Sequence, residues 1–261
     1  MDYTRAMYPQ YRYPLTFVLP ILWDWAVGHH RSFIQDAHGA SELLGDELRY
    51  AGLEHIPPEG PLLVTHNHYA RPGFGEWWLV MSAAAALPGN PHLIMTGELT
   101  RWFRPWGGPI SRFALPRIAR MYGFTPMPPM PPRPQDVRAR AKAVRRVVEV
   151  TREDPNAVVI VAPEGRDNLE GGNLAPPPPG VGRFLLLLAE RGLPVLPVGG
   201  WESDGALNVH FGRVYTLAVP PQLRADDKDK AATEIVMSHL AALLPAGLRG
   251  PYSPPDQPGA G

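Results

Sequence analysis

The fold is decided by the stretch Ala157-Val158-Val159-Ile160-Val161-Ala162, in which every side chain is apolar. Successive side chains of a strand point to opposite faces of a sheet, so an unbroken apolar run indicates a strand that is buried on both faces. Such strands occupy the interior of parallel sheets that helices cover on both sides. The stretch therefore predicts a central parallel strand.

Shorter apolar runs alternate with helical patterns around this stretch, between Asp46 and Phe211. The runs predict five further strands, at Leu48–Leu53, Leu62–Thr65, His92–Met95, Val195–Val198 and Leu207–Phe211. Apolar residues at helical spacing predict helices at Glu76–Leu87, Asp136–Arg152, Val181–Arg191 and Ala231–Leu244. This alternation is typical of βαβ units, so we expect an α/β fold with a mostly parallel central sheet flanked by helices.

The chain divides by composition into three parts. Residues 1–45 are predicted to be an N-terminal amphipathic or helical segment, and residues 46–245 a single domain. Residues 246–261 form a Pro/Gly-rich tail that we expect to be disordered. Inside the domain, Thr125–Pro134 reads T-P-M-P-P-M-P-P-R-P and predicts an extended loop that its prolines stiffen.

The N-terminal part contains the apolar stretch Pro14–Gly28, which Pro20 and Asp24 interrupt. The stretch falls short of the roughly 20 residues that a membrane-spanning helix needs, and no signal-peptide pattern precedes it. Aromatic side chains that favour the lipid headgroup layer surround it: Tyr3, Tyr8, Tyr11, Tyr13, Trp23 and Trp25. Two interpretations remain open, a segment that lies on a membrane surface and a helix that packs its aromatics against the domain.

Composition argues against several classes of partner. Lys plus Arg and Asp plus Glu each number 25, so the chain lacks the basic surplus of a nucleic-acid binder. The absence of cysteine excludes thiol nucleophiles, disulfides and Cys-ligated metals. His66 and His68 are followed by no third ligand at metal spacing, so we expect no metal site.

A first group of polar residues follows the predicted strand Leu62–Thr65 and reads His66-Asn-His-Tyr-Ala-Arg-Pro-Gly-Phe-Gly-Glu76. Ligands bind at the carboxyl ends of strands in α/β sheets, where a histidine can accept a proton near neutral pH. We identify His68 as the candidate base and Glu76 as the carboxylate that would orient it. The alternatives are a buried histidine and an ordinary acid in the first turn of a helix. Arg71 meets either a phosphate or solvent, and His66 is expected to be structural.

A second group follows the central strand and reads Pro163-Glu-Gly-Arg-Asp167. Gly165 lets the backbone approach a ligand closely, and Arg166 supplies a planar cation that suits phosphate. Glu164 could bind a hydroxyl of the substrate or orient Arg166.

Several blocks together, in this order, resemble the glycerolipid acyltransferase family of the 1-acylglycerol-3-phosphate type. The blocks are Leu53-Glu-His-Ile-Pro57 with Gly60-Pro-Leu-Leu-Val64, Asn67-His68, Val161-Ala-Pro-Glu-Gly165, Gly180-Val181 with Leu193-Pro-Val-Leu-Pro-Val198, and Phe211-Gly212. The resemblance implies transfer of a fatty acyl group from a coenzyme A or acyl-carrier-protein thioester to a hydroxyl of a (lyso)phospholipid or related glycerolipid.

The resemblance also implies roles for individual residues. His68 would act as general base with no acyl-enzyme, and the block with Glu164 and Gly165 would hold the head group of the acceptor. We also expect Asn67, Arg71 and Arg166 to bind substrate. The thioester is then a co-substrate, and no other cofactor is expected. The protein would work in the cytoplasm, peripheral to the inner face of the cell membrane, on a lipid acceptor.

Three departures leave the family's His/Asp motif degenerate. The family places an aspartate five positions after the histidine, where this chain has Gly73, so Glu76 serves only if the loop carries a three-residue insertion. Arg166 stands one position earlier than the family's arginine. The proline run also replaces a further family block that contains an arginine, and Arg133 is the only candidate for that cation. The alternatives to an acyltransferase are a non-catalytic lipid- or acyl-binding relative and a hydrolase. Contact between Glu76 and His68 Nδ1 would favour an enzyme.

Overall fold

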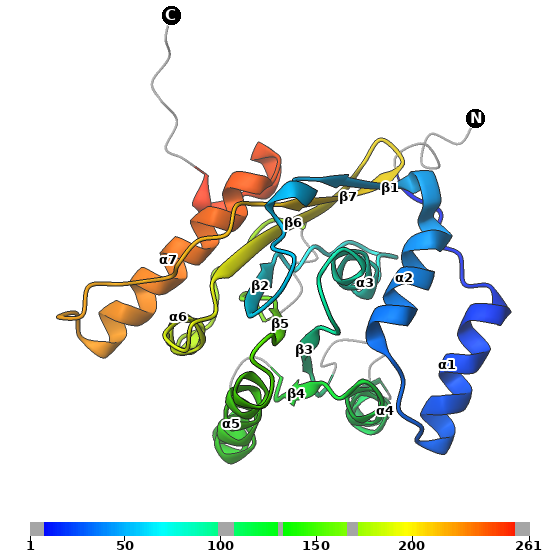
Figure 1. Cartoon of the computed structure of the whole chain (residues 1–261), viewed down its shortest axis with the longest axis horizontal. Helices are drawn as coiled ribbons and strands as arrows, with labels where there is room; N and C mark the ends of the chain where they lie inside the picture. The colour runs from blue at the N-terminus through cyan, green and yellow to red at the C-terminus, as the bar shows by residue number, and fades with distance from the viewer. Residues whose placement is uncertain (1–7, 99–106, 130–132, 166–171, 254–261) are drawn as a thin grey trace, which may run out of the picture.

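The computed structural model describes residues 8–98, 107–129, 133–165 and 172–253 (Figure 1). A seven-stranded sheet with the order β1-β7-β6-β2-β5-β3-β4 runs through the molecule. Its strands are β1 (Leu48–Ala51), β2 (Leu62–His66), β3 (His92–Thr96), β4 (Thr125–Met127), β5 (Val158–Val161), β6 (Val195–Ser203) and β7 (Ala206–Phe211). Neighbouring strands pair in parallel except β6 and β7, which form an antiparallel hairpin. The predicted α/β class is confirmed.

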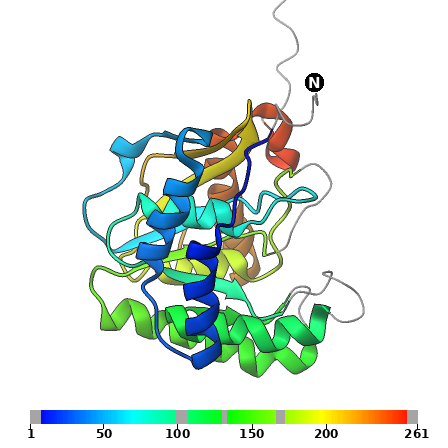
Figure 2. The same ribbon diagram turned by 90° about the vertical axis from the view of Figure 1, so that its right-hand side faces the viewer.

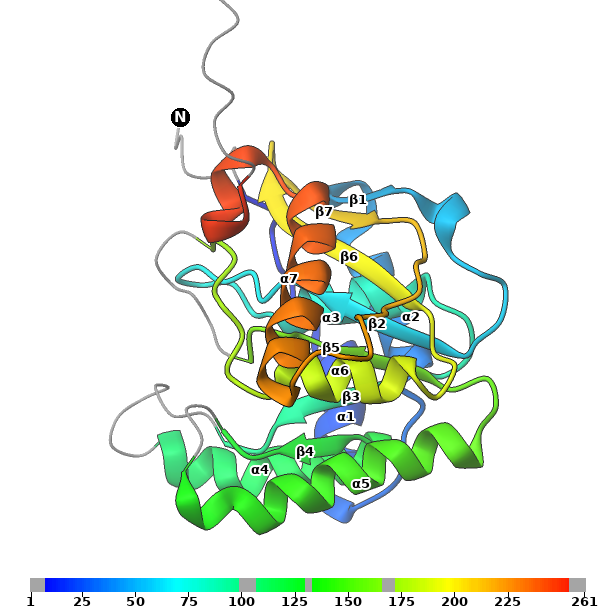
Figure 3. The ribbon, with the colours of Figure 1, turned by 90° about the vertical axis from the view of Figure 1, so that its left-hand side faces the viewer.

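Helices cover both faces of this sheet. They are α1 (Leu15–Val27), α2 (Phe33–Leu44), α3 (Trp77–Ala85), α4 (Gly107–Tyr122), α5 (Val137–Glu153), α6 (Val181–Ala189) and α7 (Ala225–Leu243). Figure 1 shows α1 to α4 on one side of the sheet, and Figure 3 shows α5, α6 and α7 on the other. The central strands therefore contact helices on both faces, as the apolar run at β5 predicted.

Side-chain alternation along the central strands builds two hydrophobic cores. In β5, Val158 and Ile160 pack with residues of α2 and α3, whereas Val159 and Val161 pack with residues of α6 and α7. All four side chains are buried. An unbroken apolar run satisfies both faces at once, which is why this short stretch specifies the middle of the sheet.

Three segments differ from the sequence-based predictions. Residues 125–127 of the expected proline-stiffened loop form β4, an edge strand where a proline is tolerated. Helix α4 was not predicted. The tail was predicted to be disordered from residue 246, but Ala246–Leu248 and Gly250–Tyr252 are short 3₁₀ helices. They are held in place because Leu248 O accepts a hydrogen bond from Leu174 N, at 2.9 Å.

The N-terminal segment contains two helices, α1 and α2, and α1 packs against α4 at the outside of the molecule (Figure 2). The predicted helical character of this segment is confirmed. No side chain of α1 is buried, although the helix is mostly apolar. Among the described residues, no helix is both long and apolar enough to cross a membrane.

Candidate active site

The polar segments that follow β2 and β5 meet at one edge of the sheet. Because β2 and β5 are parallel neighbours, their carboxyl ends lie side by side. A hydrogen bond joins the two segments, since the backbone N–H of His68 donates to Glu164 Oε1 at 2.7 Å. The two groups of residues that the sequence presents separately therefore form one site.

His68 and Glu76 contact each other in this site. His68 Nε2 lies 2.9 Å from Glu76 Oε2, and the two side chains are 12% and 31% exposed. The sequence argument expected the carboxylate at Nδ1, whereas the structure places it at Nε2. A carboxylate at Nε2 stabilises a proton on that nitrogen and leaves the lone pair of a neutral imidazole on Nδ1.

A tight turn brings Glu76 back to His68. In Arg71-Pro72-Gly73-Phe74, Phe74 N donates to Arg71 O at 3.1 Å. Proline at the second position and a glycine with φ of 84° at the third are the residues that a type II turn requires. The turn reverses the chain just before α3, so Glu76, the residue that precedes the helix, faces the histidine.

Electrostatics keep Glu76 ionised. Burial alone raises the pKa of this carboxyl, but the charge of His68 and its hydrogen bond lower the pKa below its ordinary value of 4.5. Glu76 is therefore an anion at neutral pH. His66 is buried, and burial lowers the pKa of its imidazole, so His66 is neutral there. Its Nδ1 donates to the backbone oxygen of Asn67 at 3.1 Å, as expected of a structural histidine.

The Asn67 side chain is fully engaged by the backbone of β6. Its Nδ2 donates to Gly200 O at 2.8 Å, and its Oδ1 accepts from Gly200 N at 2.7 Å. A Cβ at Gly200 would lie 2.1 Å from Leu79 Cδ1, so only glycine lets α3 pack this closely. This geometry favours a positioning role for Asn67, next to the predicted base. The predicted contact with substrate stays a prediction.

Glu164 is likewise engaged by backbone. Besides the bond from His68 N, its Oε2 accepts from Ala175 N at 2.6 Å, and the residue is buried. Burial raises the pKa of Glu164, although both backbone hydrogen bonds and the charge of His68 act to lower it. Because both carboxylate oxygens are occupied, the geometry favours a role in holding the His68 backbone over the predicted binding of an acceptor hydroxyl.

Arg71 forms an ion pair instead of facing a ligand. Its Nε and Nη2 donate to the two carboxylate oxygens of Glu202 at 2.5 and 2.6 Å. The Tyr8 ring covers the guanidinium, with 3.9 Å between Cζ and the ring centroid. The predicted contact of Arg71 with a phosphate thus competes with a bidentate partner from β6. Of the second predicted group, Gly165 has a φ of 61° and lines the cavity described next, and Arg166 lies outside the described residues.

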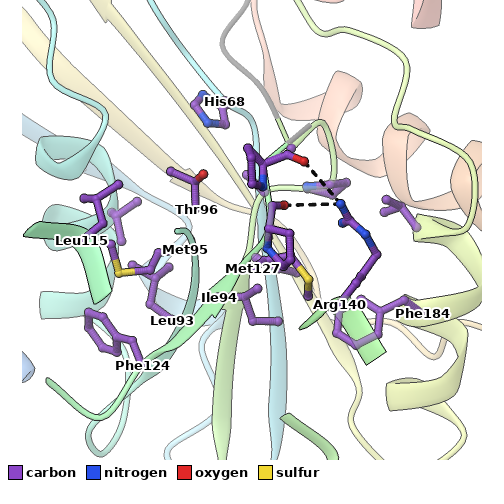
Figure 4. A pocket seen from close by; sticks show the side chains of 18 of the residues that line it. His68, Leu93, Ile94, Met95, Thr96, Leu115, Phe124, Met127, Arg140 and Phe184 are labelled. Carbon is purple, nitrogen blue, oxygen red and sulfur yellow. Dashed lines mark hydrogen bonds between the residues drawn. The ribbon is translucent and has the colours of Figure 1, made fainter. Parts of the chain in front are cut away.

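A cavity of about 1120 Å³ opens beside the His68–Glu76 pair. Figure 4 shows His68 at one end of it, with side chains of β3 and its neighbours along its length. Most of the lining is apolar and comes from β3, α3, α4 and α6, including Leu93, Ile94, Met95, Val80, Leu115, Ile118 and Phe184. A cavity of this size and character fits a long hydrocarbon chain.

Arginines of α5 and the segment before it line one side of the cavity. Arg133 pairs with Asp136 at 2.6 Å and with Glu98 at 3.2 Å, and Arg140 Nη2 donates to the carbonyls of Pro128 and Pro129 at 3.4 and 3.3 Å (Figure 4). The predicted cation Arg133 is therefore part of the lining. Within the described part of the chain, no three His, Asp or Glu side chains form a group that could hold a metal.

Sequence reasoning missed two contributions to this site. Helix α4 supplies Leu115, Ile118 and Tyr122 to the cavity, and their spacing of three and four residues was a detectable helical signal. Glu202 was missed because β6 was expected to end at Val198, before Gly199 and Gly200. The antiparallel pairing with β7 extends β6 to Ser203 despite these glycines.

Comparisons with known proteins find a similar family and a similar solved structure. The model of the Acyltransferase family matches residues 47–201. No curated protein matches the chain. Among solved structures, a similarity is found to the crystal structure of the 1-acyl-sn-glycerophosphate (LPA) acyltransferase PlsC from Thermotoga maritima. The TM-score is 0.46 and the identity 15%, over 80% of this chain and 79% of that one.

Proposed function

Because this chain belongs to the acyltransferase family, we propose that it transfers a fatty acyl group from a thioester donor to a hydroxyl of a lysophospholipid or related glycerolipid. The observation that carries the proposal is the contact between His68 and Glu76 at one end of a largely apolar cavity. Acyl transfer to a lipid hydroxyl needs a base that a carboxylate orients and, beside it, a cavity that binds a hydrocarbon chain.

In the proposed mechanism, Glu76 holds the Nε2 proton of His68. Nδ1 is buried in this structure, so binding of the acceptor has to uncover it before it can accept the proton of the acceptor hydroxyl. The hydroxyl oxygen attacks the thioester carbonyl directly, and the carbon–sulfur bond breaks as the ester bond forms. The thiolate leaves and takes up the proton from His68. Glu76 stabilises the imidazolium between these steps, because its lowered pKa keeps it anionic.

The apolar lining of the cavity supports a hydrocarbon chain as part of the substrate. In our proposal the acyl chain lies along β3, between Leu93, Met95 and Leu115, with the reacting carbonyl close to His68. Burial of each methylene group contributes about 0.8 kcal/mol, so a long chain is bound far more tightly than a short one. Gly165 follows Glu164, which binds the His68 backbone, and would allow the acceptor to approach the backbone there.

Exposed apolar residues support a membrane surface as the place of work. On α1, Leu15 and Trp23 are 70% and 66% exposed, and Ile110 and Phe113 of α4 are also exposed. Large apolar side chains gathered in the exposed parts of two adjacent helices favour an interaction site on this surface. We propose that it rests on the cytoplasmic face of the membrane, from which the acceptor enters the cavity.

The test measures thiol release from long-chain acyl-coenzyme A with and without a panel of lysophospholipids. Wild type, His68→Ala and the control His38→Ala, which changes an exposed histidine of α2, are compared. We expect acceptor-dependent release by wild type and the control, and none by His68→Ala. Release by His68→Ala at the wild-type rate would overturn the mechanism. No release by wild type, including with acyl carrier protein as donor, would favour the non-catalytic lipid-binding relative.

A further inference from the structure

Glu76 follows His68 by eight positions, whereas the family's aspartate follows its histidine by five. The two side chains meet only if residues 69–75 fold back toward His68. The type II turn at residues 71–74 reverses the chain, but a turn by itself does not fix where the reversed segment lies relative to His68. Something outside the loop has to hold it.

The ion pair between Arg71 and Glu202 fixes the position of the turn. The guanidinium donates to both carboxylate oxygens and, through Nη1, to Pro72 O at 2.9 Å, so it links the turn to β6. The Glu202 side chain is 0% exposed and that of Arg71 is 19% exposed. A bidentate pair that is shielded from water fixes distance and orientation together, which a single solvent-exposed ion pair does not.

The N-terminal segment closes over this ion pair. Tyr11 OH donates to Glu202 Oε1 at 2.8 Å, and burial, followed by the Glu202 carboxylate, raises the pKa of Tyr11 far above its ordinary value, so the hydroxyl stays a donor. The Tyr11 ring also packs against Phe74 of the turn, with 5.6 Å between centroids. Tyr11 lies before the family-matched residues 47–201, so this contact is an addition to the matched region.

The same strand holds the other side of His68. Gly200 binds the Asn67 side chain, and Glu202 binds Arg71, so alternate residues of β6 anchor the chain before and after the histidine. Gly200 binds through its backbone N–H and C=O and Glu202 binds through its side chain, so both contacts come from one strand. The position of His68 and that of the turn are thus set by one rigid element.

We propose that Arg71, Glu202 and Tyr11 form a positioning device that sets the contact between His68 and Glu76 and so allows a glutamate three residues further along the chain to serve as the orienting acid. The proposal rests on the proposed function, because the contact matters to the reaction only if His68 is the base. The three residues act through Glu76 rather than on the substrate, since their side chains are bound to one another.

The test uses conservative variants of the device in two backgrounds. Glu202→Gln, Arg71→Lys and Tyr11→Phe are each made in the wild-type protein and in the Glu76→Gln variant. Arg191→Lys, in the exposed turn that follows α6, is the matched control. Lysine cannot reproduce the bidentate geometry of arginine. We expect each variant of the positioning device to lower kcat about tenfold with KM unchanged. A general base contributes roughly 10²-fold or more to the rate, and a misplaced orienting acid should lose part of that contribution.

In the Glu76→Gln background, the device variants should have no further effect on kcat, because the contact they position is already lost. A purely structural role predicts the same fold reduction in both backgrounds, and that result would overturn the proposal. Tyr11→Phe removes one hydroxyl and keeps the ring, so it decides the question if Glu202→Gln or Arg71→Lys does not fold.

A second readout does not depend on activity. The ¹⁵N NMR signals of His68, assigned with His68→Gln, report which ring nitrogen carries the proton. We expect a proton on Nε2 in wild type and a mixture of tautomers in Glu202→Gln that matches Glu76→Gln. Unchanged signals in Glu202→Gln would overturn the proposal. If wild type transfers no acyl group but the signals change as expected, the proposed function fails and the positioning device stands.

Discussion

Glu76 lies three positions further along the chain than the family's aspartate and still contacts His68. The position of the family's aspartate is Gly73, whose φ of 84° is strained for any residue with a Cβ. An aspartate there would oppose the turn that returns the chain toward His68. Three residues later the backbone enters α3, and the longer glutamate side chain spans the remaining distance to Nε2.

The first prediction concerns Glu76→Gln. We expect kcat to fall about 100-fold or more, because the amide cannot stabilise the imidazolium. The fold should be kept, because glutamine has nearly the same shape, with only the modest loss of stability that follows from removing the charge beside His68. Steady-state kinetics and thermal unfolding check this, with Glu59→Gln, an exposed acid, as the control. A kcat within twofold of wild type would mean that Glu76 is an ordinary acid at a helix start.

The second prediction concerns the pH dependence of stability. The pKa of Glu76 is lowered in the folded protein, so its carboxylate stabilises the fold above the ordinary value of 4.5, and this contribution is lost as the pH falls through the lowered pKa. The difference in free energy of unfolding between wild type and Glu76→Gln should therefore shrink below pH 4.5. Urea unfolding of both proteins across pH 3 to 7 measures it; a constant difference would contradict the lowered pKa.

At the scale of elements, β3 and β4 form the outer part of the sheet on which the cavity is built. His92 Nε2 and Thr125 Oγ1, 2.9 Å apart, join the two strands. Burial, followed by the charge of Arg146, lowers the pKa of His92 to about 4, so the imidazole is neutral in the folded protein. Protonation in the unfolded chain then draws the equilibrium toward unfolding at acid pH.

The third prediction follows from His92. The lowered pKa contributes stability that is fully present above the ordinary value of 6.5 and decreases as the pH falls from 6.5 toward about 4. His92→Gln should make the decline of unfolding free energy over this range shallower, whereas His38→Gln, at an exposed site, should not. Urea unfolding at half-unit pH steps tests this. Parallel curves for His92→Gln and wild type would show that His92 titrates normally.

Helix α4 gives the fourth prediction, because Leu115 faces the cavity beside Met95 and Phe124 (Figure 4). In Leu115→Trp the larger ring should exclude the end of a long acyl chain. Exclusion of about four methylenes, at about 0.8 kcal/mol each, lowers kcat/KM for long donors roughly 200-fold and leaves short donors unaffected. Acyl-coenzyme A donors of increasing length measure this against Leu53→Trp, an exposed control. An equal loss at all lengths would contradict the placement of the chain.

At the scale of the whole molecule, the apolar surface of α1 lies apart from both cores. Its exposed residues Leu15, Leu19, Leu22 and Trp23 follow a helical stripe. Helix α1 is held to α4 by the Trp25 Nε1 hydrogen bond to Ala114 O at 3.3 Å and by the contact of Trp25 with Phe113. The stripe therefore points away from the domain while the helix stays attached to it.

The fifth prediction tests this surface. Wild type should sediment with vesicles of phosphatidylcholine and phosphatidylglycerol, and Leu19→Glu and Trp23→Glu should each weaken binding at least tenfold. The loss corresponds to about 1.5–3 kcal/mol of apolar burial for each side chain. Leu53→Glu, exposed elsewhere, is the control. Vesicle binding that survives both α1 substitutions would favour another use of this surface.

The sequence by itself determined the layered fold and the two polar groups that follow its strands. An apolar run such as Val158–Val161 can be satisfied only between two layers of helices, whereas the pairing of β2 with β5, which brings the two groups together, came from the structure. His68 and Glu76 were identified for the same reason, since they follow the strand Leu62–His66 directly in the chain. These features depend on local pattern and on the topology that the pattern imposes.

Only the tertiary structure decided how the side chains of the site are used. Asn67, Arg71 and Glu164 look like ligand-binding residues in sequence, yet each meets a partner that is distant along the chain, on β6 or near Ala175. The pairing of β6 with β7 placed Glu202 beside Arg71, and side-chain packing around β3 created the cavity. Such contacts join residues far apart in the chain. They produce no local or periodic pattern in the sequence, so they could not be predicted from it.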